Sequence, residues 1–304
     1  MKLRNIVAGL FLTKQLLFPD VSLAQNIETR VGTDQKENLK EKYSLIIAPE
    51  TYRDKKITAD FDGGLKNSFL LNISSIYESQ KREGYKPENI HILYADGNID
   101  TSETMNRSEI ESLTSEKYLT GKIIPATFSN ISKTIDSIAT KIDDNDEFTF
   151  TVMGHGEKAF PETHIKLPYD LDLRGMPGKL TPTNINYFAD KIKAGQETYV
   201  IDACYSGDFS KGLLGENQKV FTSSSSESPS LISRMDSFSR YLHYAKTDKE
   251  ADKNNDGIIS WEEAFEKAEY ERLPVIKKHE QAGHTLFGKF PLEGFYGQKY
   301  NLGE

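Results

Sequence analysis

Two short segments of this chain end in side chains that could act together in nucleophilic catalysis. The first is the apolar run Phe148 to Met153, which leads to His155, and the second is Thr198 to Ala203, which leads to Cys204. A thiolate can attack a carbonyl carbon, and an imidazole can take up the proton and return it later. A cysteine and a histidine brought to one place would therefore support acyl transfer.

Both apolar runs have the length and the β-branched content of buried strands. In an open parallel sheet the carboxyl ends of the strands form one edge, where ligands bind. We therefore expect His155 and Cys204 to lie at the same edge. Gly156 permits a turn in which backbone N–H groups face a substrate carbonyl. Gly156 and Cys204 are accordingly candidates for the donors of an oxyanion hole.

The order and separation of the two motifs are informative. Cys204 lies about 50 residues after His155, the separation found in caspases. A lone cysteine or histidine is most often structural, but two strand-end motifs in this order favour a catalytic pair. Here the chain resembles the caspase-like superfamily of cysteine peptidases, and within it the legumain-like branch. The resemblance implies that Cys204 is the nucleophile and His155 the general acid/base.

The rest of residues 43–247 fits the fold that this resemblance implies, a caspase-like α/β/α sandwich with a mainly parallel central sheet. Alternation of strands and helices is typical of a parallel sheet that is covered on both faces. About 205 residues are enough for one such domain. We expect further strands at 44–48, 89–94 and 220–224 and helices at 65–83, 129–142 and 184–194.

The legumain-like resemblance also implies residues that bind substrate. Arg53 occupies the place of an arginine in the primary specificity pocket, and Asp236 resembles an acidic partner of that arginine. Ser224 ends a strand whose following segment pairs with substrate in the family. An arginine donor facing a carboxylate acceptor would suit an asparagine side chain, which offers both kinds of group. We therefore expect cleavage after asparagine; a dominant Asp236 would favour arginine or lysine instead, and a dominant Arg53 would favour aspartate.

A twelve-residue segment near the C-terminus matches an EF-hand calcium loop at every diagnostic position. Gly257 at position six permits the sharp turn, and the other diagnostic residues offer oxygen, which a hard cation prefers. The alternative is a solvated acidic loop that caps a helix beginning near Trp261. Because the sequence has no second loop of this kind, we expect one structural Ca²⁺ rather than a sensor. The expected ligands are Asp252, Asn254, Asp256, Ile258 through its carbonyl, Ser260 and Glu263.

The N-terminus has the features of an export signal. Lys2 and Arg4 precede the apolar run Ile6 to Leu12, and small residues at Ser22 and Ala24 suit a signal peptidase. Residues 1–24 are therefore expected to be a signal peptide, which predicts a secreted or periplasmic protein. No other segment approaches the roughly 18 apolar residues of a membrane span. The single cysteine of the chain excludes an internal disulfide.

The expected organisation is a signal peptide at 1–24, a polar linker at 25–42, the peptidase domain at 43–247, and a small α-helical extension with the EF-hand at 248–304. The formal net charge of −8 argues against nucleic acid as a partner. We therefore expect a cysteine endopeptidase that acts on peptides or proteins and uses no organic cofactor. A peptide ligase that uses the same acyl-enzyme remains open, as does a catalytically silent, calcium-stabilised binding module on the same fold.

Overall fold

The structure of this chain is a computed structural model that describes residues 40–49, 65–97, 123–170, 176–213, 215–230, 237–281 and 298–300. The chain divides into two compact units, Met1–Asn38 and Leu39–Glu304. The first unit lies outside the described residues, and the expected signal peptide lies there with it. The fold below is that of the second unit.

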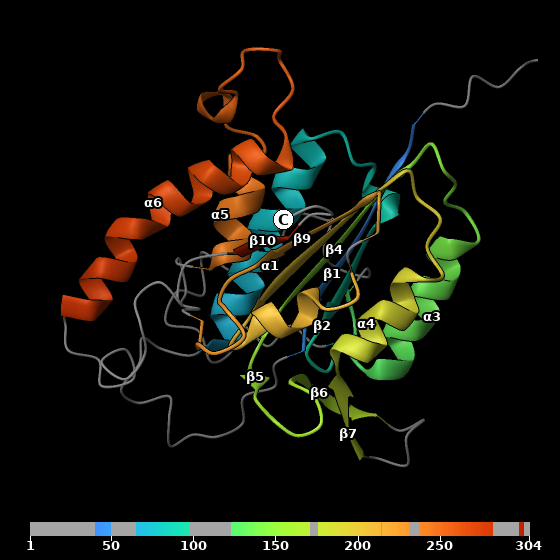
Figure 1. The fold of residues 1–304 in the computed structure, drawn as a ribbon. Helices are drawn as coiled ribbons and strands as arrows, with labels where there is room; N and C mark the ends of the chain where they lie inside the picture. The colour runs from blue at the N-terminus through green and yellow to red at the C-terminus, as the bar shows by residue number, and fades with distance from the viewer. Residues whose placement is uncertain are drawn as a thin grey trace, which may run out of the picture. The chain divides into compact units, whose positions relative to one another are not determined.

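A seven-stranded sheet forms the centre of this unit (Figure 1). Every neighbouring pair of strands is parallel except the last, in which β10 runs antiparallel to β9. Parallel neighbours need long crossover connections, and helices supply most of them here. In spatial order the strands are β10 (Gln298–Tyr300), β9 (Gln218–Thr222), β8 (Gln196–Ala203), β4 (Glu147–Gly154), β1 (Lys42–Ala48), β2 (Ile90–Tyr94) and β3 (Ile123–Ile124).

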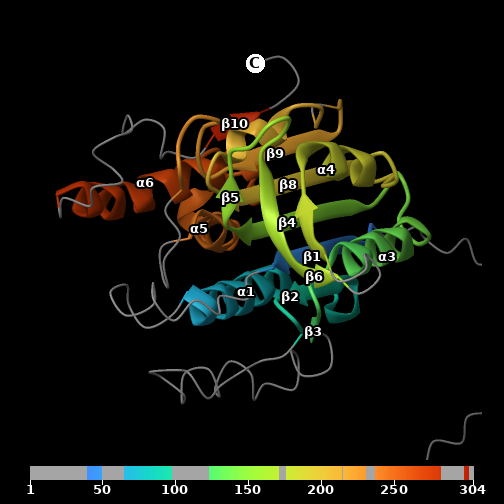
Figure 2. The same ribbon diagram turned by 90° about the horizontal axis from the view of Figure 1, so that it is seen from below.

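Helices cover both faces of the sheet (Figures 1 and 2). One face carries α3 (Phe128–Ala139) and α4 (Pro182–Ala189), and the other carries α1 (Leu65–Arg82), α5 (Phe238–Ala245) and α6 (Trp261–Gln281). Successive strand residues point to opposite faces; on β8, Tyr199 and Ile201 join the α3 and α4 core, while Val200 joins the α5 and α6 core. The expected α/β/α sandwich with a mainly parallel sheet is confirmed.

Several parts of the fold did not follow from the sequence patterns, among them the short edge strands β3 and β10. A second, three-stranded antiparallel sheet consists of β5 (Gly156–Glu157), β6 (His164–Asp170) and β7 (Met176–Leu180). Helix α5 was not expected either, although Phe238, Leu242 and Ala245 have helical spacing and are fully buried. Eight residues give only two turns of periodicity, which is a weak signal. Within the described residues, no helix is long and apolar enough to cross a bilayer.

The C-terminal helices α5 and α6 pack against β4, β8 and β9 of the sheet. Trp261, at the start of α6, shares a buried cluster with Val200 of β8 and Phe221 of β9. His243 of α5 is fully buried, with its Nε2 2.9 Å from Thr151 Oγ1 on β4. Its ring meets the Trp261 ring edge-on at 5.4 Å between centroids. Burial lowers the pKa of His243 to about 3, so this histidine is a neutral, structural one at physiological pH.

Candidate active site

The pairing of β4 with β8 brings His155 and Cys204 together. These strands are parallel, and their last pair in register is Gly154 with Ala203. His155 and Cys204 are the next residues on the two strands, so both leave the sheet at the same level. Neighbouring strands lie about 4.8 Å apart, which puts the two residues side by side at the carboxyl edge. The sheet thus brings the two expected catalytic residues to one place.

Gly156 lies directly against the backbone of Cys204. A Cβ atom on Gly156 would come within 2.0 Å of the Cys204 carbonyl oxygen and 2.9 Å of its carbonyl carbon. No real side chain tolerates such distances, so only glycine fits here. The histidine turn and the cysteine turn therefore touch each other through their main chains.

The chain reverses sharply after the cysteine. Tyr205 has a φ of 60°, a left-handed conformation that costs free energy in a residue other than glycine. The Tyr205 N–H donates to the Ser228 carbonyl at 2.8 Å, and a short 3₁₀ helix, η3 (Ser206–Ser210), follows. This turn ends β8 before Cys204 and fixes the backbone conformation at the residue that follows the cysteine.

The Cys204 thiol is enclosed by the segment that follows β9. The Ser230 N–H donates to the Cys204 sulfur at 3.3 Å, and the thiol lies 3.9 Å from the Ser230 carbonyl oxygen as a donor. Burial raises the pKa of Cys204, the Ser230 N–H lowers it, and the nearby charge of Asp202 raises it. The net direction is upward. At neutral pH the thiol is therefore protonated and needs a base before it can attack.

Three serine hydroxyls form hydrogen bonds that support the turn around Cys204. Ser206, Ser223 and Ser224 are fully buried. Ser223 Oγ accepts from the Ala203 N–H at 3.1 Å, and Ser224 Oγ donates to the Ala203 carbonyl at 3.1 Å. Ser206 Oγ accepts from the Ser224 N–H at 3.1 Å. These bonds join the turn after β8 to the turn after β9, next to Cys204.

This finding changes the interpretation of Ser224, which was expected to bind substrate. Its side chain has 0% exposed surface and uses its hydroxyl within the buried cluster. A side chain without exposed surface offers nothing for a substrate to contact. In this structure Ser224 supports the cysteine turn instead.

Polar contacts fix the loop that follows the histidine. Lys158 donates to the Ser226 carbonyl at 3.4 Å and forms an ion pair with Glu227. Further along, Thr163 Oγ1 donates to Asp208 of η3 at 2.6 Å. The loop is therefore held both to the segment after β9 and to the turn after Cys204.

Two expected pocket residues, Arg53 and Asp236, lie outside the described residues. Two other residues at the site were not expected. Asp202 is fully buried two positions before Cys204, and a charged residue inside an apolar strand was the signal available in the sequence. Ser230 touches the thiol from 26 positions away, a contact that no local pattern indicates.

The expected calcium loop joins a short 3₁₀ helix, η4 (Lys249–Ala251), to α6. Gly257 has a φ of 83°, the left-handed conformation that position six of the loop requires. The Asp252 carboxylate accepts from the N–H groups of Asp256 at 3.2 Å and Gly257 at 3.0 Å. The backbone of the expected calcium loop is thus folded around the loop's own acidic side chains.

Glu263 has a second role at this loop, which is to cap α6. Its carboxylate accepts from the Ser260 N–H at 2.9 Å, while its own N–H donates to Ser260 Oγ at 3.1 Å. This is a reciprocal capping box. The Ser260 N–H above all, with N–H donors from Asn254 and Lys253, lowers the pKa of Glu263 to about 2. Among the described residues, no three His, Cys, Asp or Glu side chains are gathered as a metal-binding group.

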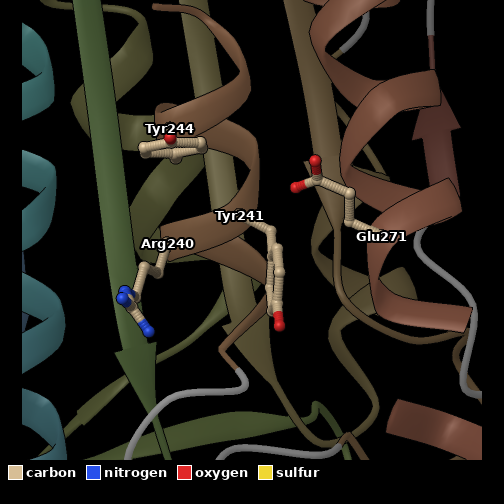
Figure 3. Close-up of a pocket in the computed structure, with 4 residues that line it drawn as sticks. All are labelled: Arg240, Tyr241, Tyr244 and Glu271. Carbon is tan, nitrogen blue, oxygen red and sulfur yellow. The ribbon is translucent and has the colours of Figure 1, made fainter. Parts of the chain in front are cut away.

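A pocket of about 250 Å³ lies between α5 and α6, on the face of the sheet that these two helices cover (Figure 3). In the figure Tyr241 and Tyr244 project from α5, and Glu271 faces them from α6. The described residues that line this pocket are Arg240, Tyr241, Tyr244 and Glu271. None of the expected catalytic or calcium-binding residues is among these described lining residues.

Comparison with known protein families gives one match. A family model described as the caspase domain matches residues 110–271, more than half of the 304 residues of the chain. The matched region contains both β4 with His155 and β8 with Cys204, and it continues into α6. A search of curated proteins found no match.

The contact of Gly156 with Cys204 generates a prediction. Gly156→Ala should lower kcat/KM for a peptide substrate by about 10²-fold, because the new Cβ must push the two turns apart and a shift of about 1 Å can cost that much. Gly215→Ala is the matched control, since its Cβ would meet only the flexible Gln218 side chain. Steady-state kinetics of both variants would check this. Equal activity of the two variants would mean that the turns are not held as tightly as the contact indicates.

Proposed function

This chain belongs to the caspase-domain family, and on that premise we propose that it is a cysteine endopeptidase in which Cys204 is the nucleophile and His155 the general acid/base. Membership of the family makes it a cysteine peptidase in general class, with peptides or proteins as substrates. The observation that carries the assignment of residues is the register of β4 and β8, which ends at Gly154 and Ala203.

The state of the thiol determines how the first step must run. Because burial raises the pKa of Cys204, His155 has to remove the proton as sulfur attacks the substrate carbonyl. The resulting imidazolium then gives the proton to the leaving amine, and an acyl-enzyme forms on Cys204. Water, activated by the same imidazole, hydrolyses that thioester. The N–H groups of Gly156 and Cys204 are the proposed donors to the oxyanion.

The first prediction tests the two catalytic roles. Cys204→Ala should abolish peptide hydrolysis, and His155→Ala should lower it by at least about 10²–10⁴-fold, the usual contribution of general acid/base catalysis. His91→Ala on β2 is the matched control and should retain activity. Cleavage of a broad peptide library and iodoacetamide labelling of the single thiol would both be measured.

The same experiment separates the alternatives. Full activity of Cys204→Ala would exclude the proposed mechanism. A wild-type protein that neither cleaves the library nor reacts with iodoacetamide would favour the silent binding module. Capture of an added peptide amine in place of water would identify a ligase, because both reactions pass through one acyl-enzyme.

For specificity, we propose a legumain-like preference for asparagine before the scissile bond. Arg53 would donate to the side-chain carbonyl of that asparagine, and Asp236 would accept from its NH₂ group. Both residues are placed in this role by resemblance alone.

A series of substrates that differ only in the residue before the cut would test this preference. The wild type should cleave after asparagine faster than after alanine, and both Arg53→Ala and Asp236→Ala should reduce that ratio. Arg82→Ala, at the exposed end of α1, is the control for loss of an arginine. A ratio near one in the wild type, or an unchanged ratio in both variants, would show that other residues form the pocket.

We also propose that residues 252–263 hold one structural Ca²⁺. The oxygen donors suit a hard cation, and the left-handed Gly257 supports the required loop conformation. Bound there, the ion would clamp η4 to the start of α6. Because Glu263 now caps the helix, calcium would have to draw this carboxylate toward Asp252 and Asp256. The proposal thus rests on the positions of Asp252, Asp256, Gly257 and Glu263.

Calcium should raise the thermal stability of the protein. If Kd is about 10⁻⁴ M, as in many extracellular sites, 10 mM calcium would add about 2.7 kcal/mol to the free energy of unfolding. Glu263→Gln should remove most of that gain, whereas Glu216→Gln, exposed just before β9 and outside the loop, should keep it. Melting curves with and without calcium measure the effect. Identical shifts in the two variants, or no shift in the wild type, would contradict the site.

A further inference from the structure

The Asp202 carboxylate is buried and accepts several hydrogen bonds, yet the proposed mechanism does not use it. One of its oxygens accepts three hydrogen bonds from the start of α5: from Ser237 Oγ at 2.7 Å, the Ser239 N–H at 2.9 Å and Ser239 Oγ at 2.9 Å. The side chain is fully buried. A buried carboxylate is costly unless several donors surround it, and a helix N-terminus is a favourable place for it. Asp202 therefore anchors α5 to the end of β8.

The other oxygen of Asp202 faces the residue that touches the nucleophile. It accepts from Ser230 Oγ at 3.4 Å, a long hydrogen bond. The Ser230 N–H, in turn, donates to the Cys204 sulfur at 3.3 Å. Asp202 thus accepts hydrogen bonds from both Ser230 and Ser237. Of these two residues, Ser230 also holds the Cys204 thiol through its N–H.

We propose that Asp202 is a positioning residue for hydrolysis: it holds Ser230 so that the Ser230 N–H stays on the Cys204 sulfur when the thiolate forms. This inference rests on the proposed role of Cys204 as nucleophile. A donor at that position stabilises the thiolate that attacks the substrate. Asp202 would act through Ser230 and would not itself touch the reacting atoms.

Electrostatics alone would not explain an acid at this position. The negative charge of Asp202 opposes formation of a thiolate two residues away, and its effect on the pKa of Cys204 is upward. His155 lies at the same level at the end of the neighbouring strand. The other charged groups of the two turns, Glu157, Lys158 and Asp208, are paired with Lys166, Glu227 and Lys211. The benefit of Asp202 must therefore come from the geometry that its hydrogen bonds impose.

The first arm of the test removes the link between Asp202 and Ser230 without removing the acid. Ser230→Ala should shift the midpoint of iodoacetamide alkylation upward by about 0.5–1 pH unit, because the N–H is no longer held on the sulfur. Ser230→Thr keeps the hydroxyl and should restore the midpoint. Ser225→Ala removes a hydroxyl from the same segment without touching Asp202 and should leave the midpoint unchanged. The single cysteine of the chain makes the labelling unambiguous.

The second arm removes the charge. Asp202→Asn should lower kcat by about 10-fold or more with little change in KM, even though loss of the charge by itself favours the thiolate. Circular dichroism would check that the variant folds, and if it does not, the Ser230 variants decide. Unchanged or higher kcat in a folded Asp202→Asn, or the same alkylation midpoint for Ser230→Ala and wild type, would overturn the proposal. A loss confined to one class of residue before the cut would also overturn it, since that pattern means direct contact with substrate.

The alkylation measurement does not depend on peptide cleavage. If the wild type cleaves nothing, the proposed function fails, yet the midpoints of the Ser230 variants still report whether Asp202 positions the N–H on the thiol. The two ideas can therefore fail separately.

Discussion

The register between β4 and β8 is the constraint on which the rest of the site depends. These strands are parallel from Glu147 paired with Gln196 to Gly154 paired with Ala203. A slip of one residue would turn every side chain of one strand to the opposite face. That slip would expose residues that now fill the two cores, so hydrophobic burial itself keeps His155 level with Cys204. The position of His155 beside Cys204 is in this sense a consequence of core packing.

Around that pair, buried polar groups rather than apolar packing shape the edge of the sheet. The hydroxyls of Ser206, Ser223 and Ser224 join the turns after β8 and β9. Asp202 joins β8 to α5. Hydrogen bonds are directional, so a fully satisfied network fixes turns more sharply than contact between hydrocarbons does. This network surrounds the turn of Cys204, a thiol whose pKa is raised by burial.

The C-terminal helices belong to the same compact unit as the sheet. α5 meets β8 through Asp202 and β4 through the contact between His243 and Thr151. Trp261, the first residue of α6, packs on His243 and is also position ten of the expected calcium loop. The loop therefore contacts α5 through His243, the same residue that contacts β4. Glu263 caps α6 in the structure, so the protein's own groups already stabilise the start of this helix.

The sequence by itself determined the features that depend on short stretches of chain. Buried strands show as apolar runs, so the positions of β4 and β8, the three-layer fold and the meeting of His155 with Cys204 could all be predicted. The spacing of residues 252–263 predicted a loop with a sharp turn at Gly257, although calcium binding there stays a prediction. Each strand and the loop can be recognised within about a dozen neighbouring residues, and the shared carboxyl edge of parallel strands joins the two strand ends.

Only the tertiary structure decided the contacts between distant segments. The Ser230 N–H on the Cys204 sulfur, the burial of Ser224 and the anchoring of α5 by Asp202 all join residues 18 or more positions apart. α5 is too short for its periodicity to stand out, and the antiparallel sheet of β5, β6 and β7 includes a strand of two residues. Such features form because the sheet brings separate turns to one edge, where each polar group must find a partner or lose the free energy of hydration. No local pattern carries that information.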